Sequence, residues 1–280
     1  MFSVDSVYNG IWSTSVAPWP NPSAIHYRIG QGFTYMEVAN IQTAMQQISQ
    51  DMNNCIRFTP YVDDAHRGHD FIQISKNMFD SSIINPPTPT QTCFSFPGRV
   101  TMQYGKGQAL YMASGVDGCL HSVREIMRYL VRALGLEDEM NRPDRHYYIN
   151  VVSDNQLKPH LQNLGLLQRL YSARLLTGSF DYKSITLPSV TQYTAAGHLY
   201  AAVHGAAPPS TGNTAFGGLS RLSQGDCLGL RLLYPSTCLI PTVTCPDLYA
   251  NTSTVTAVIT VPMIPGGPIE PPSGSGSYFK

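Results

Sequence analysis

Residues 128–145 read RYLVRALGLEDEMNRPDR, and no other stretch of this sequence is as informative. We expect a helix over residues 123–134, after which Gly135 turns the chain. Arg128 and Arg132 are four residues apart, so they lie one helical turn apart on one face. An arginine guanidinium has five donors and no usable lone pair, so it cannot bind a cation. This helix therefore presents two positive charges and no metal ligand on that face.

Aligned on Gly135, the stretch follows the metzincin zinc-protease pattern H-E-x-x-H-x-x-G-x-x-H. In that pattern three histidines hold zinc and a glutamate beside the first histidine acts as general base. Here the ligand positions are Arg128, Arg132 and Asp138, and the base position is Tyr129. The pattern predicts the scaffold of a protease with no metal, no cofactor and no catalytic residue.

The chain resembles the astacin family over roughly residues 12–238, in five blocks that keep the family's order. Residues 44–60, AMQQISQDMNNCIRFTP, resemble A-M-x-x-I-x-x-x-T-C-I-R-F-x-P. Residues 93–99, CFSFPGR, and the later Gly118-Cys119 resemble C-x-S-x-x-G-R and G-C. Residues 139–151, EMNRPDRHYYINV, resemble the family's run after its third histidine, with His146 replacing an aspartate. Residues 222–238 resemble its closing L-S-x-x-D, leucine–tyrosine and cysteine. An unrelated helix containing RYLVR is the alternative, and five ordered blocks argue against it.

The family's methionine turn, S-I-M-H-Y, is altered as well. Residues 180–188 read FDYKSITLP, which places Thr186 at the methionine and Pro188 at the tyrosine. No single shift of register restores all of the altered positions, which are Arg128, Tyr129, Arg132, Asp138, Thr186 and Pro188. The resemblance therefore indicates a degenerate pseudoprotease.

The resemblance implies an α+β, astacin-like metzincin fold. An N-terminal mixed sheet with two long helices would face an irregular C-terminal subdomain across a cleft. We assign residues 1–11 to an N-terminal extension, 12–238 to the pseudopeptidase domain and 239–280 to a proline- and glycine-rich tail. Residues 1–23 should be irregular, and strands are expected over 25–29 and 71–75. Apolar spacing predicts a helix over 35–52, and a short helix should end the domain within 220–234.

Six cysteines are an even number, which favours disulfides. The resemblance implies that Cys55 pairs with Cys238 and that Cys93 pairs with Cys119. By elimination Cys227 pairs with Cys245, although Cys227 as a buried free thiol is an open alternative.

Asn251 begins a glycosylation sequon. The first ten residues, MFSVDSVYNG, lack the features of a signal peptide. We nonetheless expect a secreted, extracellular protein.

Charged residues make up only 13% of the chain, and Lys+Arg equals Asp+Glu. This balance gives no electrostatic case for nucleic acid or anionic lipid. The apolar tail segment 255–264 is too short to span a bilayer, so membrane insertion is not expected. It is either a strand that joins another sheet or a disordered linker. His66, His69 and Asp70 are close together in the sequence and could bind a metal, but turn residues before a strand are normally solvated, so we do not expect a metal site there.

Three functions remain open. The chain is a non-catalytic binding or structural component of an extracellular assembly, or a soluble pseudoprotease that captures peptides or protease partners in the residual cleft. The third is an enzyme with an unrecognised site. We favour the first, with protein partners or self-assembly, because activity depends on the site and not on the scaffold.

Two further expectations concern charge. Arg128, Arg132 and Asp138 should converge if the family's backbone path is kept, because its three ligands point at one spot. Two buried guanidinium groups repel each other, so we predict that Asp138 forms a salt bridge with at least one of them. The alternative is that both arginines extend into solvent. Glu139 stands where the family buries its mature amino terminus, and Arg142 or another donor is expected to hold it instead.

Overall fold

A computed structural model gives the fold of the chain. The structure describes residues 11–13, 17–76, 92–100, 107–115, 117–162, 166–167, 173–175, 180–189, 193–194, 197–203, 220–238 and 245. Asn251, the proline-rich segment 81–91 and the tail apart from Cys245 lie outside these residues. In the described part of the chain, no helix is long and apolar enough to cross a membrane.

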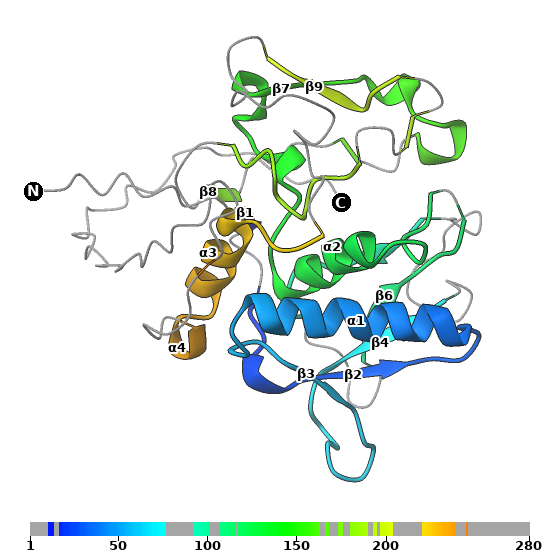
Figure 1. The fold of residues 1–280 in the computed structure, drawn as a ribbon, viewed down its shortest axis with the longest axis vertical. Helices are drawn as coiled ribbons and strands as arrows, with labels where there is room; N and C mark the ends of the chain where they lie inside the picture. Colours follow the sequence, from blue (N-terminus) through cyan, green and yellow to red (C-terminus); the bar gives the residue numbers. More distant parts are fainter. Residues whose placement is uncertain are drawn as a thin grey trace, which may run out of the picture.

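The centre of the fold is a five-stranded mixed sheet in the order β3-β2-β4-β6-β5 (Figure 1). Its strands are β2 (Ile25–Ile29), β3 (Phe58–Pro60), β4 (Phe71–Ser75), β5 (Phe94–Ser95) and β6 (Gln108–Tyr111). All neighbours pair in parallel except β5, which is antiparallel to β6. The predicted strands 25–29 and 71–75 are therefore confirmed, and β5 forms one edge of the sheet.

Two helices, α1 (Tyr35–Asp51) and α2 (Val123–Leu134), pack side by side on this sheet (Figure 1). Thr34 begins α1 with a capping box, in which its hydroxyl accepts from the Glu37 amide and the Glu37 carboxylate accepts from the Thr34 amide. That exchange satisfies two backbone donors that a helix end would otherwise leave unpaired. Both helices confirm the predicted ranges, except that α1 ends one residue earlier than expected.

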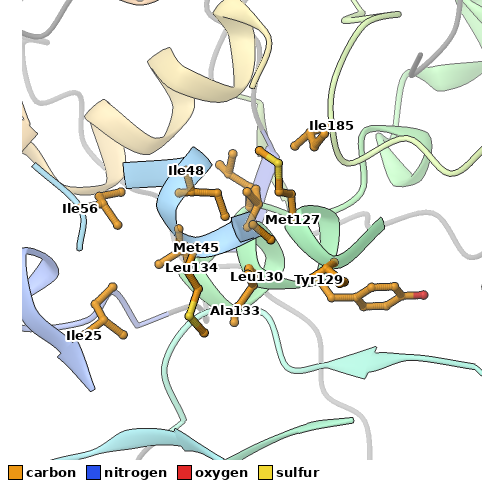
Figure 2. Packing of buried hydrophobic residues seen from close by; sticks show 14 of the residues in the cluster. Ile25, Met45, Ile48, Ile56, Met127, Tyr129, Leu130, Ala133, Leu134 and Ile185 are labelled. Atoms are coloured by element: carbon orange, nitrogen blue, oxygen red, sulfur yellow. The ribbon is translucent and has the colours of Figure 1, made fainter. Parts of the chain in front are cut away.

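The main core lies between the helices and the sheet. Figure 2 shows Met45 and Ile48 of α1 meeting Leu130 and Leu134 of α2. All four are buried, as is Ile25 of the sheet. Full burial of such a side chain contributes about 1.5–3 kcal/mol, so this interface supplies much of the stability of the domain.

The second half of the described chain is more irregular. Strands β7 (Ile149–Val151) and β9 (Tyr200–Ala202) pair antiparallel over a second core, to which Met140, Phe180 and Leu187 belong. Helices α3 (Gln224–Leu233) and α4 (Pro235–Cys238) return to the first core. Short 3-10 turns occupy Pro22–Ala24, Glu139–Asn141, Arg145–Tyr147, Asp154–Gln156 and Pro159–Leu161.

One expectation for the start of the chain is wrong. Residues 1–23 were expected to be irregular, yet β1 (Ile11–Ser13) pairs with β8 (Ala173–Leu175). The two strands are far apart in sequence and only three residues long, so no local pattern reveals them.

All three predicted disulfides are present. They join Cys55 to Cys238, Cys93 to Cys119, and Cys227 to Cys245. Cys227 is therefore not a free thiol. The Cys55–Cys238 bridge spans 183 residues, which corresponds to about 5 kcal/mol in the chain-entropy model.

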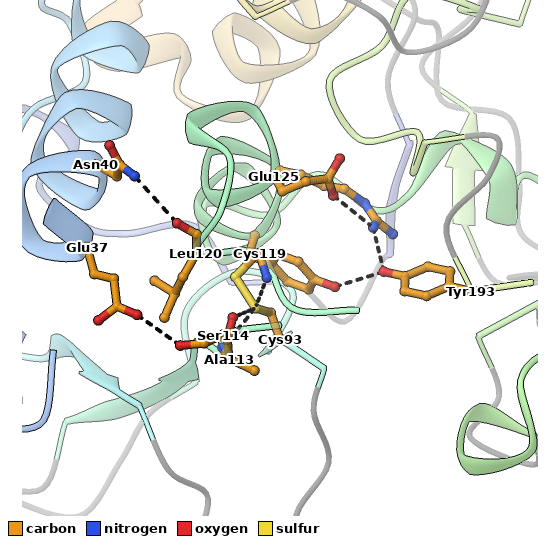
Figure 3. Close-up of a disulfide and its surroundings, with 11 residues drawn as sticks. Glu37, Asn40, Cys93, Ala113, Ser114, Cys119, Leu120, Glu125 and Tyr193 are labelled. Atoms are coloured by element: carbon orange, nitrogen blue, oxygen red, sulfur yellow. Dashed lines mark hydrogen bonds and ion pairs between the residues drawn. A yellow bond between two sulfur atoms is a disulfide. The ribbon is translucent and has the colours of Figure 1, made fainter. Parts of the chain in front are cut away.

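The Cys93–Cys119 bridge fixes the chain just before α2 (Figure 3). Cys93 Sγ also accepts from the amides of Ala113 at 3.1 Å and Cys119 at 2.9 Å. A Cβ at Gly118 would lie 2.1 Å from the Ala113 carbonyl oxygen, so only glycine fits there. This contact gives a physical reason for the Gly118-Cys119 pair in the sequence.

Candidate functional site

Helix α2 and the turn that follows it bring the three ligand positions of the sequence pattern together. Arg128 and Arg132 lie one turn apart on α2, which ends at Gly135. Gly135 has φ 120°, a conformation that favours glycine, and it reverses the chain so that Asp138 returns to the helix. Arg128, Arg132 and Asp138 form what we call the arginine cluster.

Arg128 is the buried centre of the arginine cluster. Its Nε and Nη2 donate to the two carboxylate oxygens of Asp138 at 3.1 and 3.0 Å. Nε also donates to the Thr186 carbonyl at 2.9 Å, and Nη1 donates to the Tyr193 hydroxyl at 2.8 Å. Only 4% of the Arg128 surface is exposed. The predicted salt bridge of Asp138 is thus confirmed, and Arg128 does not extend into solvent.

The environment of Arg128 favours its charged form. Burial alone would lower the pKa of the guanidinium, but nearby Asp138, together with Tyr193, Tyr129 and Glu125, raises it well above its usual value. Glu125 lies on the preceding turn, with a carboxylate oxygen 3.7 Å from Arg128 Nη1 (Figure 3). Arg128 is therefore a permanent cation held by surrounding acceptors.

Arg132 joins α2 to the edge of the sheet. Its Nη1 lies 2.8 Å from a carboxylate oxygen of Glu137 and 3.5 Å from Asp138. Its Nε donates to the Ser95 carbonyl of β5 at 3.1 Å. The side chain is 24% exposed, so solvent weakens its ion pairs more than those of Arg128. Asp138 nonetheless contacts both guanidinium groups, as a bridging charge should.

Tyr129, at the general-base position, is tied to a second tyrosine. Its hydroxyl lies 3.0 Å from the hydroxyl of Tyr193, which also accepts from Arg128. Burial raises the pKa of the Tyr129 phenol well above its usual value. Figure 2 shows its ring extending away from Leu130 and Ala133. Tyr129 is a neutral phenol at ordinary pH and cannot act as the family's carboxylate base.

The two altered positions of the methionine turn differ in their surroundings. The carbonyl of Thr186 accepts from Arg128, and its hydroxyl accepts from the Glu139 amide at 3.0 Å. Pro188 does not contact the arginine cluster through any described hydrogen bond, and its carbonyl accepts from the Tyr200 hydroxyl at 2.6 Å. Only Thr186 therefore belongs to the network around Arg128.

A second buried network lies next to the arginine cluster. Arg142 donates to Glu139 at 2.9 Å, which confirms Arg142 as the expected partner of Glu139. Glu139 also accepts from the Asp181 amide at 2.9 Å. The Asp226 carboxylate accepts from the Ser184 hydroxyl at 2.6 Å, and all three carboxylates are buried. We call Glu139, Arg142, Asp181 and Asp226 the acidic network.

The acidic network holds more carboxylates than cations. Burial raises the pKa of Glu139 to about 7, although Arg142 lowers it. Burial, with Asp226 and Glu139 nearby, raises the pKa of Asp181 to about 7. The pKa of Asp226 is raised mainly by burial as well. Glu139 and Asp181 therefore take up protons near neutral pH, where most carboxylates are fully charged.

Three members of the site were absent from the sequence prediction. Glu125 lies three residues before Arg128 on α2, so the spacing of charges along that helix offered a signal, whereas Glu137 lies in the turn after the helix and its pairing with Arg132 needs the fold. Tyr193 lies in a region without a clear pattern. It has φ 72°, which is rare outside glycine and costs free energy, and its hydroxyl bridges Arg128 and Tyr129.

Chemically, the arrangement offers donors where a metal would need lone pairs. Within the described residues, no group of three or more histidine, cysteine, aspartate or glutamate side chains is placed to hold a metal. The prediction of a metal-free, inactive site remains to be tested by experiment.

Comparison with known proteins identifies the scaffold. Residues 12–235 match the family model described as Astacin, a peptidase family. No curated protein sequence matches the chain.

Among solved structures, the chain is similar to high choriolytic enzyme 1, a hatching enzyme zinc-protease from Oryzias latipes (medaka fish). The two share 21% sequence identity with a TM-score of 0.56, over 84% of this chain and 97% of that one. A myroilysin structure shares 17% identity at a TM-score of 0.46, over 81% of this chain and 98% of that one. At these identities the likeness concerns the fold alone.

Proposed function

This chain belongs to the astacin family, and we propose that it serves as a non-catalytic extracellular protein in a binding or structural role. The observation that supports the proposal is the bidentate pair of Arg128 with Asp138. It occupies the positions from which active members of the family would hold their metal. A site whose own groups satisfy one another has no open position for a reacting molecule.

Zinc is the metal that the family pattern implies, and these residues do not fit it. Zinc is bound by cysteine, histidine or carboxylate groups, usually four ligands in a tetrahedron. Of Arg128, Arg132 and Asp138, only the aspartate can be a ligand, and both of its oxygens accept from Arg128. Two cations at the same place would repel a divalent ion. We derive no hydrolytic step through a metal.

Within the proposal, assembly is favoured over capture of a peptide in the residual cleft. An added peptide strand needs free backbone groups on an exposed edge. On the edge strand β5, the Ser95 carbonyl already accepts from Arg132 Nε at 3.1 Å. A peptide that pairs at Ser95 would have to displace that bond. The low charged content, 13% of the chain, also suits a protein that meets other proteins through polar surfaces.

Two measurements on the full chain test the proposal. Hydrolysis of denatured casein is followed with and without added zinc, with the medaka hatching enzyme as a positive control. We expect no zinc-dependent cleavage above the background of a heat-denatured sample. Sedimentation velocity over a range of concentrations then separates a defined oligomer, expected for an assembly component, from a monomer. Turnover that a chelator abolishes would overturn the non-catalytic proposal, and a monomer at every concentration would shift it towards soluble binding.

A further inference from the structure

Three histidines gather where strand β2 meets the connection between β3 and β4. His26 lies on β2, while His66 and His69 belong to the connection between β3 and β4. The rings of His26 and His66 stack with centroids 3.9 Å apart. His69 faces His26 with centroids 5.4 Å apart. Sequence spacing brought His66 and His69 together, but it did not reveal His26.

The distance between one ring nitrogen of His26 and one of His69 suits two ligands of a single metal ion. His26 Nε2 and His69 Nδ1 are 3.3 Å apart. In the metal-free protein the two nitrogens share a hydrogen bond, and the tautomers of the rings decide which nitrogen donates. Two nitrogens bound to one tetrahedral zinc, each at 2.0–2.1 Å, are about 3.3–3.4 Å apart. The ring nitrogens therefore already have the separation of a pair of zinc ligands.

The third imidazole has a different role. His66 Nδ1 accepts a hydrogen bond from the Val62 amide at 3.0 Å, so in the neutral ring the hydrogen is on Nε2. Neither nitrogen of His66 is then free to bind a metal. The His66 amide also donates to the Val62 carbonyl, and the His69 amide donates to the His66 carbonyl. His66 thus fixes the loop so that His69 stays opposite His26.

Two ion pairs involve charged groups near the histidine pair. Arg28 pairs with Asp63 and lies over the Tyr61 ring, 4.9 Å from its centroid. Asp70 pairs with Arg99 at 2.5 Å. No described carboxylate is therefore committed to neutralising His26 or His69, and burial, with His66 and His69 nearby, lowers the pKa of His26. Bound to an ion through these two nitrogens, each neutral ring would carry its hydrogen on its other nitrogen.

Space for further ligands adjoins the pair. A surface pocket is lined by His26, Gly68, His69 and Asp70, with Trp19 and Pro20 on its apolar side. The His26 Nδ1 atom is buried without a protein partner, so bound water is expected there. His69 is exposed, which gives an ion direct access from solvent.

We propose that His26 Nε2 and His69 Nδ1 form a surface site for a divalent late transition metal, with zinc as the ion that fits the spacing. The remaining positions would be filled by water. Such an ion would tie the β3–β4 loop to β2. This inference does not depend on the proposed function, because the site is separate from the arginine cluster.

The test is zinc titration of the full chain by competition with a chromophoric chelator at pH 7.5. We expect one zinc per chain. His69→Ala should weaken binding by more than roughly tenfold, since even an outer-shell partner of a ligand is commonly worth that much. His121→Ala removes another exposed imidazole on a different segment and is the matched control, which should bind as the unmodified chain does. Binding should also weaken at pH 5.5, because protons compete for the imidazoles.

A second readout locates the ion. In imidazole nitrogen NMR spectra, zinc should shift Nε2 of His26 and Nδ1 of His69 while the signals of His66 keep their tautomer. Tryptic cleavage after the exposed Arg67 should slow with zinc in the unmodified chain but not in His69→Ala. Equal zinc affinity in the unmodified chain and His69→Ala would overturn the proposal, as would no binding by the unmodified chain.

Discussion

Removal of the Asp138 carboxylate should destabilise the fold, because it leaves Arg128 charged and buried. The side chains of the pair are 5% and 13% exposed, so the cost of breaking a buried ion pair applies, about 3–5 kcal/mol. Arg128 keeps the Thr186 carbonyl and the Tyr193 hydroxyl as acceptors, which places the cost near the lower limit. Arg132 is more exposed and adds little.

We therefore expect Asp138→Ala to lower the free energy of unfolding by about 3 kcal/mol. For a domain of this size that corresponds to a fall in Tm of roughly 6–12 °C. Asp138→Asn keeps an acceptor but loses the charge, so its cost should be about 2 kcal/mol. Combining Arg128→Met with Asp138→Leu should recover most of the loss, because an apolar pair of similar volume often replaces a buried ion pair without cost.

Equilibrium urea unfolding with the disulfides intact, followed by intrinsic fluorescence, measures these differences. The matched control is Asp63→Ala, which breaks the pair with Arg28 at side-chain exposures of 79% and 36%. Its cost should stay within about 1 kcal/mol. If Asp138→Ala proves no more costly than Asp63→Ala, Arg128 is solvated in the native protein and the arginine cluster does not hold the fold.

Three further predictions concern the surrounding structure. Because Asp181 and Glu139 have pKa values raised to about 7, the native state binds more protons than the unfolded chain, so stability should fall as pH rises from about 4 to 7. Asp181→Asn should reduce the fall of Tm between about pH 4 and 7. An unchanged slope of Tm against pH would contradict the raised pKa of Asp181. Replacing Cys227 and Cys245 together with alanine opens a loop of 18 residues and should lower the free energy of unfolding by about 3 kcal/mol, measured by urea unfolding. An unchanged free energy of unfolding would mean that this disulfide does not restrict the unfolded chain. Tyr193→Phe removes a hydroxyl that accepts from the buried Arg128, so it should lower the free energy of unfolding by about 1–3 kcal/mol in the same assay. A change near zero would refute this hydrogen bond.

Local sequence patterns were enough to predict the helices and strands that bury one face against the first core. Helix α2 has both the predicted limits, because Gly135 ends it in a conformation that favours glycine. The strand β4 was recognised from its run of β-branched and aromatic residues. By contrast, β1 and β8 are defined by their pairing with each other, which only the folded chain brings about.

The sequence predicted those residues of the site that lie at positions of the family's motif. That spacing placed Arg128 and Asp138 together, and their opposite charges made a salt bridge the expected outcome. It could not supply Tyr193, whose contact with Arg128 spans 65 residues of chain. Nor could it place His26 beside His69, since parallel pairing of β2 with β4 creates that neighbourhood.

Zinc content tests the central claim most directly, provided that the surface histidine pair is removed first. His69→Ala protein, dialysed against a weak chelator and then against zinc-containing buffer, should retain no stoichiometric zinc by elemental mass spectrometry. The reason is that Arg128 and Arg132 supply no lone pair and Asp138 is engaged by Arg128. One zinc per chain that persists in His69→Ala and disappears when Asp138→Ala is added to that variant would show that a metal still binds at the arginine cluster, and would contradict the account.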